Sequence, residues 1–138
     1  MFRNWKLEIV KLINMDKKYR IAIIEDEPFL ATMYVTKFEL EGFEVLRASD
    51  GTEGLELIKN NRPDLILLDI VMPKMDGFEV LTLLKKDAET AKIPVILLTN
   101  LGQRTDIEKG MALGAADYII KANYTPAQVV AKAKEHLK

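Results

Sequence analysis

The 138-residue chain has no cysteine and a single histidine, His136. Without thiols the chain has no disulfide, no thiolate metal site and no thiol nucleophile. One histidine, two residues from the C-terminal end, argues against a histidine-rich metal site and against a serine-type catalytic triad. No apolar run approaches the roughly 20 residues that span a bilayer, and the first residues lack the pattern of a secretory signal. We therefore expect a cytoplasmic protein with no membrane partner.

An excess of charge of either sign is also missing. Twenty Lys and Arg oppose 21 Asp and Glu, which leaves a net charge of −1. This balance argues against a strongly basic nucleic-acid-binding protein, and we expect no direct contact with nucleic acid. Hydrophobic residues make up 49% of the chain and charged residues 30%, a composition that can bury a core. The length fits one domain.

The first 18 residues differ from the rest. They carry five basic and two acidic side chains, a net charge of +3. Apolar residues recur there at helical spacing: Phe2, Trp5, Ile9, Leu12 and Ile13. A basic amphipathic helix suits a membrane surface, a partner helix, packing on the domain or pairing in a homodimer. Disorder, or a natural start at Met15, fits equally. We predict an extension over 1–18, helical or disordered, and a domain over 19–138.

From Tyr19 onward, strand and helix patterns alternate five times. Arg20–Ile24, Leu65–Leu68 and Ile93–Leu98 are almost continuously apolar, as in strands of a parallel sheet buried on both faces. Phe43–Arg47 is mixed, as in an edge strand, and Tyr118–Ile120 is short enough for the other edge. These patterns predict a doubly wound, five-stranded parallel α/β sheet of order 2-1-3-4-5, flavodoxin-like, with helices on both faces.

Capping signals mark the helices between these strands. Pro28 fits a first helical position, and Gly42 and Gly114 fit helix ends. N-caps with a Glu or Gln three residues later are predicted at three positions, Asp50, Asp76 and Thr125.

Polar side chains stand where the strands end. Glu25 and Asp26 follow the first strand, Asp69 the third, Thr99 the fourth and Lys121 the fifth. Ligands of open parallel sheets bind at the carboxyl ends of the strands, near the point where strand order reverses. We therefore expect the three acids to crowd together there.

Such crowding is costly. Two unit charges about 6 Å apart repel by roughly 3 kcal/mol at an effective dielectric near 20, so three pairs approach about 8 kcal/mol. The whole stability of a small domain is about 5–15 kcal/mol. The acids must be screened, partly protonated or neutralised by a cation. Oxygen ligands without His or Cys favour a hard cation, Mg²⁺ above all.

With these residues in place, the sequence resembles the receiver domain of two-component response regulators, a chemotaxis-regulator-like family. The resemblance covers about residues 19–138 and rests on four stretches: Ile23–Pro28, Leu67–Gly77, Pro94–Thr99 and Gly114–Lys121. The second stretch, LLDIVMPKMDG, is highly specific for the family's phosphoacceptor strand and loop.

The resemblance implies a phosphoacceptor and a metal site. Asp69 would accept a phosphoryl group from a histidine kinase or phosphotransfer protein. Mg²⁺ would be held by Glu25, Asp26, Asp69 and the backbone carbonyl of Val71. The chain would not be an enzyme in the ordinary sense, since it assists only its own phosphorylation and dephosphorylation.

The resemblance also implies a switch. Thr99 and Lys121 would bind phosphoryl oxygens, and Tyr118 would change rotamer with Thr99. Two positions depart from the family pattern. Asn100 stands where a small residue is usual, and either narrows access or points away. Ala122 stands where a proline after a cis bond is usual; we expect a trans bond, which would redirect the loop, or a strained cis bond.

These features favour a single-domain response regulator that switches a surface for a downstream protein, although the chain is equally well a fragment of a longer one. The alternative is a phosphorylation-independent interaction module with the same fold. A phosphatase of the haloacid dehalogenase type would need a second Asp at position 71, where this chain has Val71. The apolar Val71 also suggests slow self-dephosphorylation. A flavodoxin-like flavin binder would need a Ser, Thr or Gly phosphate loop after the first strand, whereas Glu25, Asp26 and Glu27 would repel a phosphate unless a metal intervened.

Overall fold

A computed structural model of the chain describes residues 4–9, 18–100 and 104–137. The sheet contains five parallel strands in the order β2-β1-β3-β4-β5. Their bounds are β1 Arg20–Ile24, β2 Glu44–Ala48, β3 Leu65–Asp69, β4 Val95–Thr99 and β5 Asp117–Ile120. The predicted fold class and strand order are therefore confirmed.

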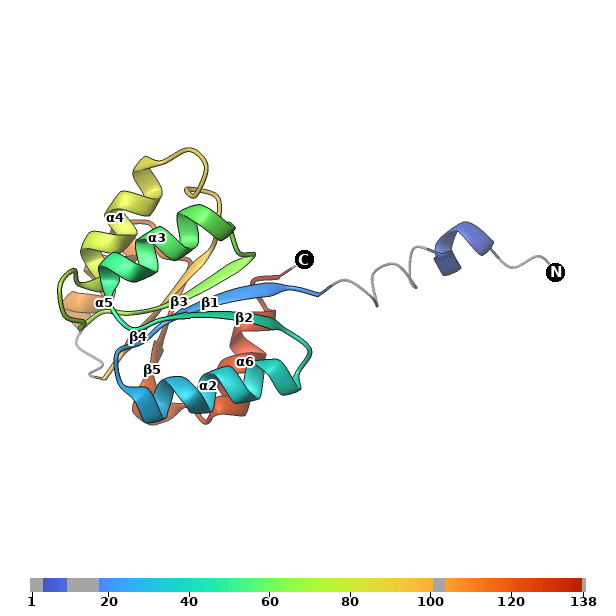
Figure 1. Cartoon of the computed structure of the whole chain (residues 1–138), viewed down its shortest axis with the longest axis horizontal. Coiled ribbons are helices and arrows are strands. Elements are labelled where there is room, and N and C mark those ends of the chain that lie inside the picture. Colours follow the sequence, from blue (N-terminus) through green and yellow to red (C-terminus); the bar gives the residue numbers. More distant parts are fainter. Residues whose placement is uncertain (1–3, 10–17, 101–103, 138) are drawn as a thin grey trace.

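Helices cover both faces of this sheet (Figure 1). The α-helices are α2 Pro28–Leu40, α3 Gly51–Asn61, α4 Gly77–Lys86, α5 Arg104–Ala112 and α6 Pro126–Lys134, with a short 3₁₀ turn, η1, at Lys121–Asn123. Helices α2 and α6 lie on one face, and α3, α4 and α5 lie on the other (Figure 1).

The alternation of side chains along each strand builds two cores. Ile21 and Ile23 of β1 point into the core beneath α2 and α6, where Phe38 and Val129 are buried. Ala22 and Ile24 point into the core beneath α3 and α4. Both faces of the central strands are therefore dry, which explains their nearly continuous apolar sequence.

Three strands begin at residues other than the predicted ones, and β2, β3 and β4 each end one residue later than predicted. The fourth strand begins at Val95 rather than Ile93, because the Ile93 N–H donates to the Thr90 carbonyl in a turn and Pro94 has no N–H. The second strand begins at Glu44, because the N–H of Phe43 is used by the end of α2. The fifth strand begins one residue early, at Asp117.

The predicted caps are confirmed. Asp50 and Asp76 accept hydrogen bonds from backbone N–H groups three residues on, at 2.8 and 2.9 Å. Thr125 and Gln128 form a reciprocal capping box. One cap was missed: Glu27 accepts from two N–H groups in the first turn of α2.

Two glycines let the loop between β3 and α4 lie close to its neighbours. A Cβ at Gly77 would overlap the carbonyl oxygen of Asp69, and a Cβ at Gly51, where α3 begins, would overlap the carbonyl oxygen of Met75. Lys74 in this loop has a φ of 68° and pairs with Asp50 at 3.4 Å. The loop that follows Asp69 is thus fastened to the start of α3.

The N-terminal region is described only in part. Residues 5–9 form a helical turn on which Trp5, Leu7 and Ile9 are exposed. Phe2, Leu12, Ile13 and Met15 lie outside the described residues, so the extension over 1–18 stays a prediction. Within the described ranges, no helix is both long and apolar enough to cross a membrane.

Candidate functional site

The carboxyl ends of β1 and β3 bring three acids together. Glu25 follows β1 and Asp69 ends β3, and the two strands are direct neighbours in the sheet. Carboxylate oxygens of Glu25, Asp26 and Asp69 lie within 4.8 Å of one another. Glu25 and Asp69 are buried, at 0% and 3% exposure, whereas Asp26 is exposed. The predicted crowding of acids is confirmed.

Lys121 lies among these acids. Its Nζ donates to Glu25 Oε1 at 2.5 Å and to Asp69 Oδ2 at 2.9 Å, and only 8% of its side chain is exposed. Described peptide bonds include no cis bond, so the bond from Lys121 to Ala122 is trans. The chain enters the η1 turn at Lys121, and the ammonium group still points into the site.

Burial and hydrogen bonding separate the acidities of the two buried carboxyls. Burial raises the pKa of Asp69, and hydrogen bonding with Glu25 raises it further, to about 7. Burial also raises the pKa of Glu25, but hydrogen bonds with Asp69 and Lys121 outweigh burial and lower it. Burial disfavours the charged form of Lys121, yet its bonds to both acids raise its pKa. Lys121 is therefore favoured as a cation and Glu25 as an anion, while Asp69 keeps its proton until about pH 7.

The backbone orients the two carboxylates. The Val71 N–H donates to Asp69 Oδ1 at 3.3 Å, so the two oxygens of Asp69 have different partners, an amide and an ammonium. The Glu27 N–H donates to Glu25 Oε2 at 3.2 Å. The Val71 side chain itself is 72% exposed, whereas the two carboxylates are buried.

The remaining predicted residues lie in β4 and β5 or directly after them, with Ala122 exposed in the η1 turn. Thr99 is buried at the end of β4 and pairs with Ile120, the residue before Lys121. Asn100 is exposed. Tyr118 is half-buried and packs on the core beneath α3 and α4.

Tyr34 of α2 was missed as a neighbour of the site. Its side chain is buried, burial raises its pKa, and it lies close enough to feel the charges of Lys121, Glu25 and Asp69. Its place in a stripe of apolar residues on α2 suggested only a core residue, and no pattern in the sequence distinguished it.

The composition of the acidic site fits a hard divalent cation. All candidate ligands are carboxylate oxygens, and three acidic side chains surround a single ammonium group, that of Lys121. Asp26 is the exposed member of the three acids.

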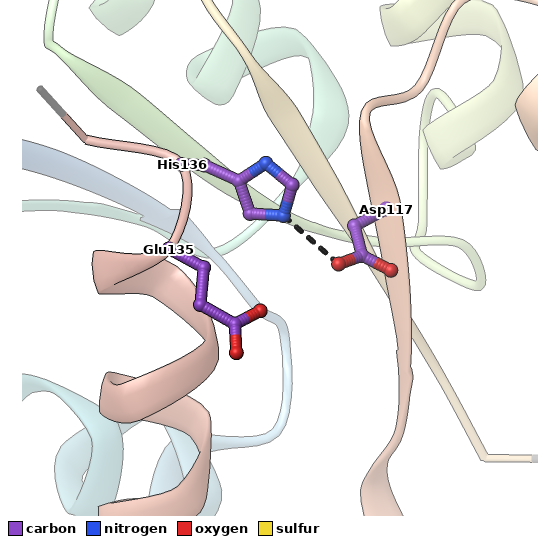
Figure 2. Close-up of side chains that lie close together, drawn as sticks. All are labelled: Asp117, Glu135 and His136. Carbon is purple, nitrogen blue, oxygen red and sulfur yellow. Dashed lines mark hydrogen bonds and ion pairs between the residues drawn. The ribbon is translucent and has the colours of Figure 1, made fainter.

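A second cluster lies at the other end of β5, where the strand begins (Figure 2). His136 Nε2 and Asp117 Oδ2 are 2.8 Å apart, and Lys132 Nζ is 3.3 Å from the same oxygen. Burial raises the pKa of Asp117, but the bonds from His136, the Tyr118 N–H and Lys132 lower it overall. These contacts fasten the end of α6 to β5.

Comparison with known proteins agrees with the fold and the site. The model of the response regulator receiver domain matches residues 21–134. The chain belongs to this family, as the sequence motifs predicted. Receiver domains are the signalling phosphoacceptors of two-component systems rather than enzymes in the ordinary sense, and phosphorylation and Mg²⁺ binding are typical of them.

Three relatives show the range of the family. The chain is 44% identical over 102 residues to the DNA-binding dual master transcriptional regulator RpaA of Synechocystis, covering 74% of this chain and 42% of RpaA. It is 42% identical over 102 residues to PilH of Pseudomonas aeruginosa, covering 74% of this chain and 84% of PilH. The solved chemotaxis protein CheY4 of Vibrio cholerae superposes with a TM-score of 0.82 at 25% identity, covering 88% of this chain and all of CheY4.

The coverage of these relatives differs in kind. The chain spans about half the length of several curated relatives, RpaA and the ycf27 regulators among them. It spans most of PilH. The shared family is therefore that of the receiver domain, which matches residues 21–134, and not that of the whole length of RpaA.

Proposed function

We propose that the domain over 19–138 accepts a phosphoryl group on Asp69 in a Mg²⁺-dependent reaction and thereby switches a protein-binding surface. One observation carries the proposal. A buried lysine, Lys121, holds Asp69 and Glu25 together at the carboxyl edge of the sheet, with Asp26 at the solvent side. Phosphoryl transfer requires a positioned nucleophile and positive charge beside it, and Asp69 and Lys121 provide these two groups.

The step is a displacement at phosphorus. An ionised oxygen of Asp69 attacks, an O–P bond forms, and the P–N bond to the histidine of the donor breaks, with its electron pair returning to the imidazole. Lys121 is already within 2.9 Å of Asp69 Oδ2 and can follow the charge onto the phosphoryl oxygens. The buried hydroxyl of Thr99 would donate to the same oxygens.

The metal site is formed by the acids themselves. Glu25, Asp26, Asp69 and the Val71 carbonyl would hold Mg²⁺, which when bound supplies positive charge against the acids and the incoming phosphoryl oxygens. Without it, burial keeps the pKa of Asp69 at about 7, so a fraction of the nucleophile is protonated near neutral pH.

The switch follows from the same contacts. Phosphorylation adds a dianionic phosphoryl group to one carboxylate oxygen of Asp69, so Lys121 gains a stronger acceptor and Thr99 a new one. Because Thr99 and Tyr118 lie on neighbouring strands, movement at the end of β4 would reach the packing of Tyr118. Asn100 and Ala122 would set how far the two loops move.

The partners follow from this chemistry. A histidine kinase or phosphotransfer protein would donate the phosphoryl group, and a downstream protein, or a second copy in a homodimer, would bind the switched surface in the cytoplasm. We expect no direct contact of this domain with nucleic acid or membrane.

Acetyl phosphate tests the proposal directly. Incubation of the full chain with acetyl phosphate and Mg²⁺ should add one phosphate by intact mass, and EDTA should abolish the gain. Asp69→Asn should not react. Asp87→Asn is the matched control, because Asp87 lies beyond the end of α4 and an asparagine keeps the Oδ1 acceptor for the Glu89 N–H. No mass gain in the wild type, or a gain kept in Asp69→Asn, would favour the phosphorylation-independent module.

A further inference from the structure

The outer face of α2 carries an apolar groove. Phe29 and Leu40 are 73% and 77% exposed, and Met33 lies between them. With Pro126 at the start of α6 they line a groove of about 350 Å³ whose charged lining residue is Lys37 alone. Helices α2 and α6 lie side by side there (Figure 1). Exposed apolar surface of this kind marks an interaction site.

A second exposed apolar feature belongs to the same chain. On the helical turn over residues 5–9, Trp5 and Ile9 are four residues apart and so share a face. They are 63% and 45% exposed. Trp5 is the sole tryptophan of the chain. A large aromatic side chain that stays in water does not gain the favourable free energy of burial.

The connection leads from the turn to the groove. The described chain resumes at Lys18 and joins the domain at Tyr19, whose carbonyl accepts from the Glu44 N–H and whose ring lies 6.5 Å from that of Phe43. The Phe43 N–H in turn bonds to α2 at Phe38. The N-terminal segment therefore departs beside the end of α2 that carries Leu40.

The reach is sufficient. Residues 10–17 separate the turn from the domain, and an extended chain of that length spans about 25–30 Å. Helix α2 has 13 residues and is about 20 Å long. Trp5 can therefore reach every point of the groove. A tether this short also holds the turn at a high effective concentration.

We propose that the helical turn carrying Trp5 and Ile9 docks intramolecularly in the groove between α2 and Pro126. The larger groove between α4 and α5 is a poorer host, because it lies on the other face of the sheet from α2. The docked turn would cover Phe29, two residues beyond Glu27, and so lie beside the acidic site.

Trp5 is its own reporter. In the full chain, its fluorescence should be shifted to shorter wavelength and protected from acrylamide relative to free tryptophan amide. Phe29→Ala and Leu40→Ala should each reverse both effects. Because both side chains are exposed, neither substitution should disturb the fold, and circular dichroism of each variant checks this. The second variant keeps the test valid if one of the two fails to fold. Leu83→Ala is the matched control, because Leu83 is an exposed leucine of the groove between α4 and α5.

Four results would overturn the proposal. Wild-type Trp5 could be quenched as freely as tryptophan amide, or its protection could survive both α2 substitutions. Protection lost in Leu83→Ala would place the turn on the other groove. Protection that falls on dilution, together with a dimer by light scattering, would assign the groove to a second copy of the chain.

Discussion

Replacing Asp69 by asparagine should make the metal-free domain more stable at alkaline pH. The Asp69 carboxyl is 3% exposed, and its pKa is raised from 3.8 to about 7. The unfolded chain therefore ionises this group near pH 4, while the folded protein resists ionisation until about pH 7. Each tenfold change in the ionisation constant is worth about 1.4 kcal/mol, so folding loses up to about 4 kcal/mol from this group above pH 7.

The sign of the effect fixes the assay. For an acid whose folded pKa is raised, stability is full below pH 4 and falls as the pH rises to about 7. Urea unfolding of wild type and Asp69→Asn in EDTA, at pH 5 to 8, should show an advantage of the variant that grows with pH and levels off above pH 7. A variant less stable than wild type at pH 8, or an advantage independent of pH, would refute the reasoning.

Four further changes test other parts of the molecule. Lys121→Met leaves the buried carboxyls of Glu25 and Asp69 without their cation and should lower the free energy of unfolding in urea by about 3–5 kcal/mol at pH 8. The loss should be smaller at pH 5, where Asp69 is protonated. An equal loss at pH 5 and pH 8 would contradict the ion pair between Lys121 and Asp69. Mg²⁺ at about tenfold its dissociation constant should raise the stability of the wild type by about 1.4 kcal/mol in thermal unfolding, and Asp69→Asn should lose most of this gain. Asp117→Asn should cost about 1 kcal/mol at pH 6. Because the pKa of Asp117 is lowered by His136, the Tyr118 N–H and Lys132, this cost should shrink as the pH falls below about 4, the unfolded value, toward the lower folded value, and a cost that does not change with pH would refute it. Gly77→Ala should cost about 1–3 kcal/mol in urea, because the new methyl meets the backbone of Asp69 and Ile70; an unchanged midpoint would show that the loop yields.

The sequence predicted the fold because its strands are buried on both faces. Runs such as Leu65–Leu68 have no solvent side, and a parallel sheet is the arrangement that accounts for them. Once strand order was predicted, the crowding of Glu25, Asp26 and Asp69 followed from geometry alone.

What the sequence did not predict depends on distant partners. The Asp117–His136 pair joins residues 19 positions apart, and neither carries a local signal. Tyr34 sits in an apolar stripe and looks like any core aromatic. Glu27 was grouped with the acids beside it, whereas its carboxylate caps α2. The ion pairs of Lys121 with both buried acids also needed coordinates, because position at a strand end does not fix where a long side chain points.

The close contact of the β3–α4 loop with Gly51 has a consequence for genetic screens. Gly51 carries no reactive group, yet any larger residue there must push on Met75, and the strain would pass along the loop toward Asp69. A search for inactive mutants should thus recover position 51 beside the acidic residues. An inactive variant at position 51 would reflect a displaced backbone and not the loss of a reacting group. A second substitution that makes room beside Met75 should then restore phosphorylation of Asp69.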